Sequence, residues 1–436
     1  MTAADSSEAL TAGPAQSPSP VCPPVEPVIP ERGRAIRRGA FSAALAIAIL
    51  HGVNDAYASF LHPLLPRLMS RFDLSIADAA VLTTTLAVSA ALAQPLFGHF
   101  SDLRGRRILI AAGPVATGGF LSMMGLASGF GTLILVLVLG GLGSAAFHPA
   151  AAATAARVTA GRGSGLRHAV FSFGGAAGYA AGPLLAVLVV GWRGLEGMWV
   201  AMLPAFVLAG VLWFALPADP VRERDARRPH PAATDGPGPV RRGRAAALFA
   251  GPIALVFGIS ALTAFVQRVF LTMEPIVMAG AGKSETAGAA ALTVYLAAQA
   301  GGTLSGGWLA DRVDRRNLLI AITVLSFPAY FLAFWFPPGS ASSLVFVAMA
   351  GTLGMAVLPP IVVIAQEAAP SRAALNSGIV MGLAWATGAI GVLGAGVLGD
   401  MVGARAAALL CTPVVLVATG LALHPALSGY RRPIET

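Results

Sequence analysis

The chain has few charged residues for its length. Only 11% of its 436 residues are Asp, Glu, Lys or Arg, whereas a soluble domain carries about 25% charged residues. Hydrophobic residues make up 56% of the chain, and the mean hydropathy is +0.75. So few charges could not cover a water-facing globule of this size. The composition therefore disfavours a soluble enzyme or a disordered protein and favours a chain that folds in lipid.

Cysteine is equally scarce, since only Cys22 and Cys411 are present. Two cysteines this far apart provide neither a disulfide framework nor the ligand spacing of a zinc site. We find no other cluster of metal ligands and no set of catalytic nucleophiles, so we expect no metal, no cofactor and no enzymatic activity. Residues 1–40 are rich in proline and lack the early apolar core of a signal peptide, which predicts a disordered tail.

From Phe41 onward, apolar stretches of about 20–25 residues recur along the chain, and the alternation of a β-barrel is absent. That length suits an α-helix crossing a hydrocarbon core about 30 Å thick. Because a lipid-exposed backbone must satisfy its own hydrogen bonds, we predict an all-α membrane protein with twelve transmembrane helices. The predicted spans are 41–63, 79–100, 108–128, 130–154, 169–191, 197–217, 248–272, 286–310, 317–336, 343–365, 375–398 and 403–425.

The basic residues are distributed unevenly between the loops. If the N-terminus is inside, the cytoplasmic segments hold most of the 29 basic residues, and one arginine, Arg268, lies within a helix. This positive-inside bias predicts that both termini are cytoplasmic, and it explains the net charge of +9 without nucleic acid. The outer segments hold only Arg67, Arg71, Arg193, Lys283 and Arg405.

The longest internal loop, residues 218–247, divides the predicted helices six and six. It is rich in proline and arginine and has no apolar periodicity, so we interpret it as a flexible cytoplasmic linker; contact with anionic lipid is the alternative role for its arginines. The predicted organisation is a tail over 1–40, a six-helix bundle over 41–217, the linker, a six-helix bundle over 248–425 and a cytoplasmic tail over 426–436.

The loops after the second and eighth predicted helices resemble each other. Two six-helix halves that share a loop motif at one register suggest internal duplication, as in transporters whose substrate site lies between two bundles. An offset of 209 residues aligns Gly98 with Gly307, Asp102 with Asp311, Arg106 with Arg315, Arg107 with Arg316, and Gly182 with Gly391.

The first of these loops, Gly98-x-x-x-Asp102-x-x-Gly105-Arg106-Arg107, resembles the signature loop of the major facilitator superfamily. The resemblance implies the major facilitator fold of two six-helix bundles, with the loop and its copy latching the inner gate. Its glycine would let two helices approach closely, and its arginines would anchor to the cytoplasmic face. A loop that is basic only because it is cytoplasmic is the alternative. The predicted gating residues are Gly98, Asp102, Arg106, Arg107, Arg157, Gly307, Asp311, Arg315, Arg316 and Glu367.

Two pairings are predicted among these residues. We expect Arg157 to pair with Asp102, and Glu367 to pair with Arg312, Arg315 or Arg316. A surface ion pair of small energetic value is the alternative interpretation.

Four further segments narrow the resemblance to the fosmidomycin-resistance branch of the superfamily, whose members export drugs. The similarity spans roughly residues 41–425, and Gly178-x-x-x-Gly182-Pro183 within it also resembles the superfamily's antiporter motif, which favours export. Simple packing of small residues is the alternative. The four segments are HGVND (His51–Asp55), GLGSAAFHP (Gly141–Pro149), FSFGGAAGYAAGPL (Phe171–Leu184) and AQEAAPSRAALNSG (Ala365–Gly378).

Asp55 is the leading candidate for proton coupling. It lies about 14 residues into the first predicted helix, near the middle of the bilayer, where a carboxylate costs several kcal/mol unless it is paired, neutral or hydrated. His51 precedes it by one helical turn on the same face, so the two can exchange a proton. The alternative is a static polar cluster with Asn54 that holds helices together.

Polar and aromatic residues in other helices are candidates for contact with a substrate. His148 lies near midplane beside Pro149, which can free a backbone carbonyl. Arg268 could clamp an anionic group through its planar donors, or form an internal pair with Glu274 or Asp55. The predicted substrate-binding residues are Asn54, Tyr57, Phe147, His148, Phe171, Gln267, Arg268, Glu274, Tyr295 and Trp385.

These observations predict a secondary transporter. The phosphate-binding loop GxxxxGK[ST] is missing, so energy must come from an ion or substrate gradient. We expect a proton-coupled antiporter in a bacterial inner membrane that exports small, antibiotic-like compounds by alternating access. Its expected partners are the substrate, protons and membrane lipid, and it is expected to be a monomer. The alternatives are a symporter or facilitator that imports a metabolite, and a non-transporting receptor or scaffold.

Overall fold

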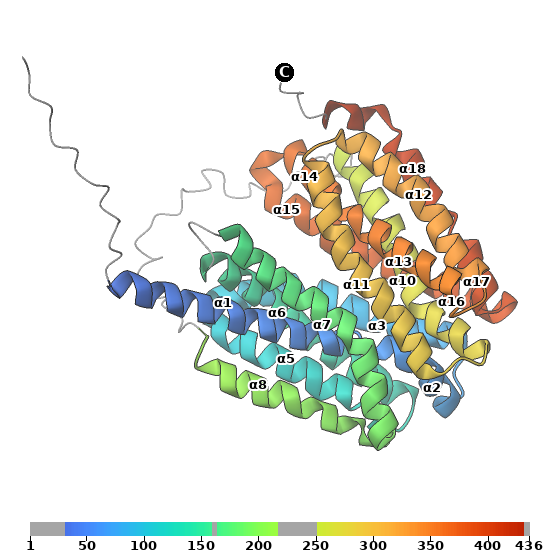
Figure 1. Cartoon of the computed structure of the whole chain (residues 1–436), viewed down its shortest axis with the longest axis horizontal. Coiled ribbons are helices and arrows are strands. Elements are labelled where there is room, and N and C mark those ends of the chain that lie inside the picture. The colour runs from blue at the N-terminus through green and yellow to red at the C-terminus, as the bar shows by residue number, and fades with distance from the viewer. Residues whose placement is uncertain (1–30, 159–163, 217–250, 431–436) are drawn as a thin grey trace, which may run out of the picture. The chain divides into compact units, whose positions relative to one another are not determined.

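The computed structural model describes residues 31–158, 164–216 and 251–430. The chain separates into two compact units, Met1–Arg38 and Gly39–Thr436, and the features below belong to the second, apart from the first residues of the first helix. The described residues form helices and short loops without a β-strand (Figure 1). The predicted all-α fold class is therefore confirmed. The linker predicted over 218–247 and most of the predicted N-terminal tail lie outside the described residues.

The described residues of the first half form eight α-helices, several of which are segments of one longer span. Proline marks some of the breaks: Pro95 lies in the first turn of α4, and Pro204 lies in the first turn of α8. The helices are α1 (Glu31–Ala58), α2 (Leu61–Phe72), α3 (Ile76–Leu92), α4 (Gln94–Arg104), α5 (Arg106–Ser122), α6 (Phe130–Val158), α7 (Ser164–Arg193) and α8 (Leu203–Trp213), with short 3₁₀ turns at Met124–Leu126 and Glu196–Met202.

The second half follows the same plan. Ser284, Ser340 and Asp314 each begin a helix by accepting a hydrogen bond from the backbone N–H three residues ahead. The helices are α10 (Pro252–Gly280), α11 (Glu285–Ala310), α12 (Arg315–Trp335), α13 (Ala341–Ala356), α14 (Leu358–Ala368), α15 (Ala373–Gly378), α16 (Ala384–Val402), α17 (Ala404–Cys411) and α18 (Val414–Ala422), with 3₁₀ turns at Pro370–Arg372 and Pro425–Tyr430 and a π-helical turn at Ile379–Leu383.

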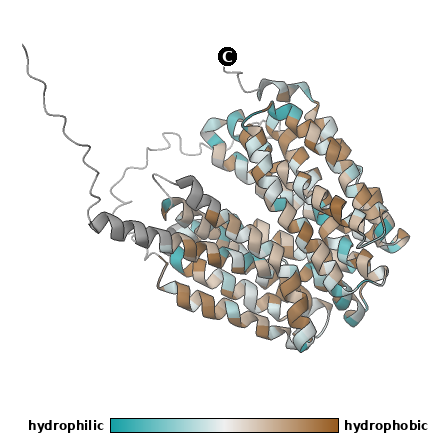
Figure 2. Cartoon of the chain, in the orientation of Figure 1, coloured by the Kyte–Doolittle hydropathy of each residue, from teal (hydrophilic) through white to brown (hydrophobic). Residues whose placement is uncertain are grey.

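Eleven spans among the described residues are long and apolar enough to cross a membrane, and α11 supplies the twelfth predicted crossing. The twelve spans fall six before and six after residues 217–250. Hydrophobic residues run along the helices of both halves (Figure 2). Because lipid is as apolar as leucine, close packing and polar contacts, rather than burial from water, must hold these helices together.

The start of α1 differs from its prediction. The sequence predicts a disordered tail through residue 40, but α1 begins at Glu31. Residues 31–40 contain Glu, Ala, Ile and four arginines, and most of these residue types form helices readily. Their helical propensity extends the helix beyond the apolar stretch that predicted its start.

Candidate functional site

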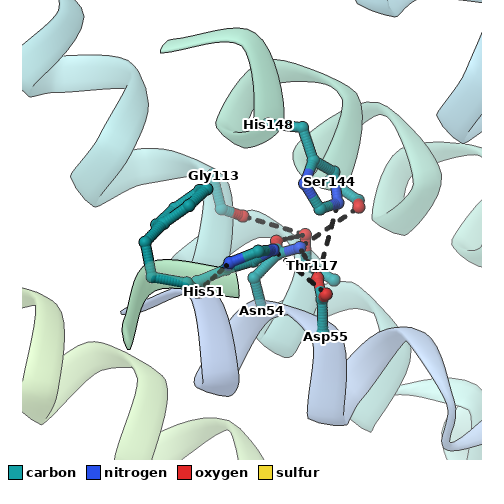
Figure 3. Close-up of polar contacts among 8 residues, drawn as sticks. His51, Asn54, Asp55, Gly113, Thr117, Ser144 and His148 are labelled. Atoms are coloured by element: carbon teal, nitrogen blue, oxygen red, sulfur yellow. Dashed lines mark hydrogen bonds and ion pairs between the residues drawn. The ribbon is translucent and has the colours of Figure 1, made fainter. Parts of the chain in front are cut away.

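A polar cluster lies inside the first half, where α1 meets α6 (Figure 3). His51 Nε2 lies 3.2 Å from Asp55 Oδ2, one turn along α1, and His148 Nε2 of α6 lies 3.4 Å from Asp55 Oδ1. The side chains of His51, Asp55 and His148 are only 12%, 17% and 31% exposed, respectively. The sequence predicts each of these residues as a functional candidate, and the structure brings them together.

The hydrogen bonds of His51 leave a place for one proton between His51 and Asp55. His51 Nδ1 lies 2.9 Å from the carbonyl oxygen of Phe171, and a carbonyl only accepts, so Nδ1 carries a hydrogen. This leaves Nε2 facing a carboxyl oxygen of Asp55. Two lone pairs at 3.2 Å repel each other, so the contact is favourable only when one proton lies between them. That proton can belong to either partner, which suits a group that binds and releases protons.

Asn54 ties this cluster to two neighbouring helices. Its amide nitrogen donates to Asp55 Oδ1 at 2.9 Å and to Ser144 Oγ of α6 at 3.2 Å. Thr117 Oγ1 of α5 in turn donates to Asn54 Oδ1 at 2.9 Å. Asn54 is completely buried, so its hydrogen bonds fix the orientation of Asp55. Thr117 had no distinguishing signal in the sequence, and Ser144 lies in the segment GLGSAAFHP without having been singled out.

Helix α7 packs tightly against α1 through its glycines. A Cβ added to Gly178 would lie 1.9 Å from the carbonyl oxygen of Gly52, and one at Gly182 would lie 1.9 Å from Ser59 Oγ. At Gly175, an added Cβ would lie 2.4 Å from Cε1 of the His51 ring. The positions that resemble the antiporter motif are therefore close-packing positions in this structure.

The aromatic candidates of the first half surround His51 or fix nearby backbone. Phe171 stacks on the His51 ring with centroids 4.4 Å apart, and the Phe147 ring lies 5.7 Å from it. Tyr57 donates to the carbonyl oxygen of Ala201. All three aromatic residues are at most 7% exposed, and Phe147 and Phe171 form walls of the cluster.

The candidates of the second half form a separate polar group. Gln299 of α11 donates to Gln267 of α10 at 3.0 Å, and Gln267 donates to the carbonyl oxygen of Gly354 at 3.1 Å. The hydroxyls of Tyr295 and Tyr330 lie 2.7 Å apart. Gln299 and Tyr330 were not predicted from the sequence, because a single Gln or Tyr in an apolar helix gives no periodic signal.

Arg268 and Glu274 do not form the internal ion pair that the sequence offered as an alternative. The Arg268 guanidinium lies 5.8 Å from the ring centroid of Trp385 and is half-buried. Glu274 is 2% exposed. Neither residue takes part in a salt bridge among the described residues.

The last arginine of each signature loop covers the end of a neighbouring helix. Arg107 donates to the carbonyl oxygen of Trp213 at 2.6 Å, and its guanidinium lies 4.1 Å from that ring. Arg316 donates to the carbonyl oxygen of Ala422 at 3.3 Å. The two arginines are 209 residues apart, and so are the two residues whose carbonyl groups accept. The structure therefore repeats the offset seen in the sequence. The gating role of both arginines stays a prediction.

The predicted pairing of Glu367 is present in the structure. Arg315 Nη1 donates to both carboxylate oxygens of Glu367, at 2.8 and 2.7 Å. Burial, and then the negative charge of Glu367, raise the pKa of the nearby Tyr430 hydroxyl. Of the other predicted gating residues, the side chain of Asp102 lies outside the description, so its pairing with Arg157 stays a prediction.

The glycines of the signature loops are not positions of unusually close packing. An added Cβ would lie 3.7 Å from Pro149 at Gly98 and 3.9 Å from Pro359 at Gly307, which are ordinary contacts. The backbone at Gly105 does favour glycine, because its φ of 99° is rarely adopted by other residues. In the second copy this position is Asp314, which begins α12 with a side-chain cap instead.

Polar contacts that were not predicted from the sequence join the two halves. Arg67 of α2 donates to both carboxylate oxygens of Glu285 of α11, at 2.6 and 2.9 Å. Asp400, near the end of α16, accepts hydrogen bonds from the backbone N–H groups of Ile76 at 2.7 Å and Ala77 at 3.2 Å. These residues are far apart in the chain and lie near helix ends, where charge is ordinary, so no sequence pattern distinguishes them.

His51, Asp55 and His148 also form a set that could hold a metal ion. One ligand atom from each residue lies within 4.8 Å of the others, and two imidazoles with a carboxylate suit a divalent transition metal. The sequence predicts no metal cluster, because Asp55 and His148 are far apart in the chain and show no ligand spacing. Only the packing of α1 against α6 brings these ligand atoms together.

A family model supplies the decisive comparison. The model of the Major Facilitator Superfamily matches residues 47–267 and again residues 256–433, which together cover most of the chain. The chain belongs to the Major Facilitator Superfamily. It is therefore a multi-pass membrane transporter, and the predicted fold of two six-helix bundles is confirmed.

Two curated members of the superfamily are similar over most of their length. The fosmidomycin resistance protein of Escherichia coli (strain K12) is 27% identical over 380 residues, covering 83% of this chain and 87% of that protein. The uncharacterized MFS-type transporter YfnC of Bacillus subtilis (strain 168) is 27% identical over 368 residues, covering 82% of this chain and 87% of that protein.

Solved structures of superfamily members share the fold at lower identity. A bacterial homolog of the human lysosomal transporter Spinster, in an inward-facing and unoccupied conformation, has a TM-score of 0.76 at 16% identity, covering 92% of this chain and 99% of that one. The nucleoside transporter NupG has a TM-score of 0.66 at 14% identity, covering 87% of this chain and 98% of that one.

Proposed function

We propose that this transporter is a proton-driven antiporter that exports a small, antibiotic-like compound through a bacterial inner membrane by alternating access. The observation that carries the proposal is the His51–Asp55–His148 cluster, whose geometry suits a bound proton within a membrane span. The identity to the fosmidomycin resistance protein supports an antibiotic-like substrate. The sequence motif at Gly178 and Gly182 favours export.

The contacts between the halves support an inward-facing conformation. The Asp400 and Glu285 contacts lie at the end of the molecule where α3 begins. With both termini cytoplasmic, as the distribution of arginine indicates, this is the outer end. At the inner end, α4 and α14 pack mainly on helices of their own half. Protonation of Asp55 from outside would then favour the return to this conformation.

Transport by everted membrane vesicles tests the proposal. Vesicles containing the wild-type protein should accumulate labelled fosmidomycin when their interior is made acidic relative to the medium. Asp55→Asn cannot exchange a proton, so its pH-driven uptake should fall to the level of vesicles without the protein. Glu196→Gln is the matched control, because Glu196 is an acid whose side chain is 67% exposed.

Three results would contradict the proposal. Full pH-driven uptake by Asp55→Asn would remove the proton-coupling role of Asp55. Movement of the compound only in the opposite direction would indicate a symporter. Loss of uptake on adding a membrane-permeant chelator would show that a metal ion, rather than a proton, occupies the cluster.

A further inference from the structure

A second carboxyl group lies inside the second half, on a face of α10 that points to the interior. Gln267 and Phe270 mark this face: Gln267 bonds to the backbone of Gly354, and the Phe270 ring stacks on Tyr295 at 4.1 Å. Glu274 follows Phe270 by four residues and therefore shares its face. Only 2% of the residue is exposed, so its carboxyl is largely shielded from water.

No described residue neutralises this carboxyl. Most ionisable side chains on the helices packed against α10 have other partners. The others are buried themselves and do not pair with the Glu274 carboxyl. Arg67 pairs with Glu285, Asp400 caps α3, Arg405 donates to the end of α12, Tyr295 pairs with Tyr330, and His62 is 4% exposed on α2. Arg268, on α10 itself, lies beside Trp385.

A carboxylate ion in this position would be costly. Burying an unpaired charge in an apolar interior costs several kcal/mol, whereas the protonated acid avoids this cost. Asp55 differs, because Asn54 donates to it and two histidines face it. The two halves therefore hold carboxyl groups in different surroundings.

We propose that Glu274 is a second proton-binding site, so that the transporter exchanges two protons in each cycle, one in each half. This inference rests on the proposed proton coupling. Helix α10 packs on α2 across the boundary between the halves. When the halves move, the surroundings of Glu274 change, which gives its proton a route to water.

Infrared spectroscopy of the full-length protein in lipid tests this site without a substrate. The wild type at neutral pH should show the C=O stretch of a protonated carboxylic acid, and this band should shift on transfer to D₂O. In difference spectra against the wild type, Glu274→Gln should remove a band that Glu274→Asp shifts, and Asp55→Asn and Glu196→Gln should leave that band in place. A wild type without such a band, a Glu274→Gln spectrum that has lost none, or a lost band that does not shift in D₂O would overturn the proposal.

The coupling ratio provides an independent test in vesicles whose membrane potential is held at zero. For each pH unit across the membrane, the ratio of labelled fosmidomycin inside to outside should change about a hundredfold in the wild type. In Glu274→Gln it should change about tenfold. Equal slopes in the two proteins would overturn the proposal. If fosmidomycin is not moved at all, the proposed substrate is wrong, and the infrared result still decides the role of Glu274.

Discussion

At the scale of the residue, Arg268 is a half-buried arginine that takes part in no salt bridge among the described residues. Arg67 and Arg315 bind carboxylates, and Arg107 and Arg316 bind backbone carbonyls. Arg268 instead lies beside the ring of Trp385. Its planar donors can therefore bind an anionic group of a substrate, as the sequence analysis proposes.

Replacing Arg268 with Lys keeps the charge but removes the planar pair of donors. A hydrogen bond to a charged group contributes about 1.5–3 kcal/mol, so we expect export of an anionic compound to fall by roughly ten- to a hundredfold. Export of a neutral compound should change much less. Vesicle uptake of both compounds measures this difference, and an equal loss for both would exclude a substrate clamp.

At the scale of the element, arginine joins helix ends that are distant in the sequence. Arg107 and Arg316 donate to carbonyl groups at the ends of α8 and α18, which have no partner within their own helix. The equal spacing of the two contacts indicates that duplication preserved a cap as well as a loop. This stabilising role was not predicted from the sequence.

Arg107→Gln and Arg316→Gln should each destabilise the protein by about 1–2 kcal/mol, because each leaves helix-end carbonyls without a charged donor. Thermal unfolding in detergent measures this loss, with the exposed Arg193→Gln as the control. We expect transport per folded molecule to change little. Normal stability combined with lost transport would instead support a gating role.

At the scale of the whole molecule, charged contacts hold the two halves together at one end. The Arg67–Glu285 pair is 41% and 26% exposed, so its contribution is about 0.2–1 kcal/mol. Asp400 adds hydrogen bonds to the start of α3. Modest energies of this size suit contacts that must break in every transport cycle.

Arg67→Glu should open this end, because two carboxylates would then face each other. The double variant Arg67→Glu with Glu285→Arg should restore closure. Spin labels at Ser128 and Lys283, in a protein with Cys22 and Cys411 replaced by Ser, report the distance between the halves. We expect longer distances in the single variant and wild-type distances in the double variant. Unchanged distances in the single variant would contradict this role.

The sequence by itself determined the membrane class, the twelve spans and the register of the duplication, because apolar length, arginine distribution and motif spacing are local properties. It also identified Asp55 and His51, which are one turn apart on one helix. Only the tertiary structure decided that His148 joins them, that Asn54 is held by Thr117 and that Asp400 caps α3. Those contacts depend on how separate helices pack, and a chain of uniformly apolar helices carries little information about which faces meet.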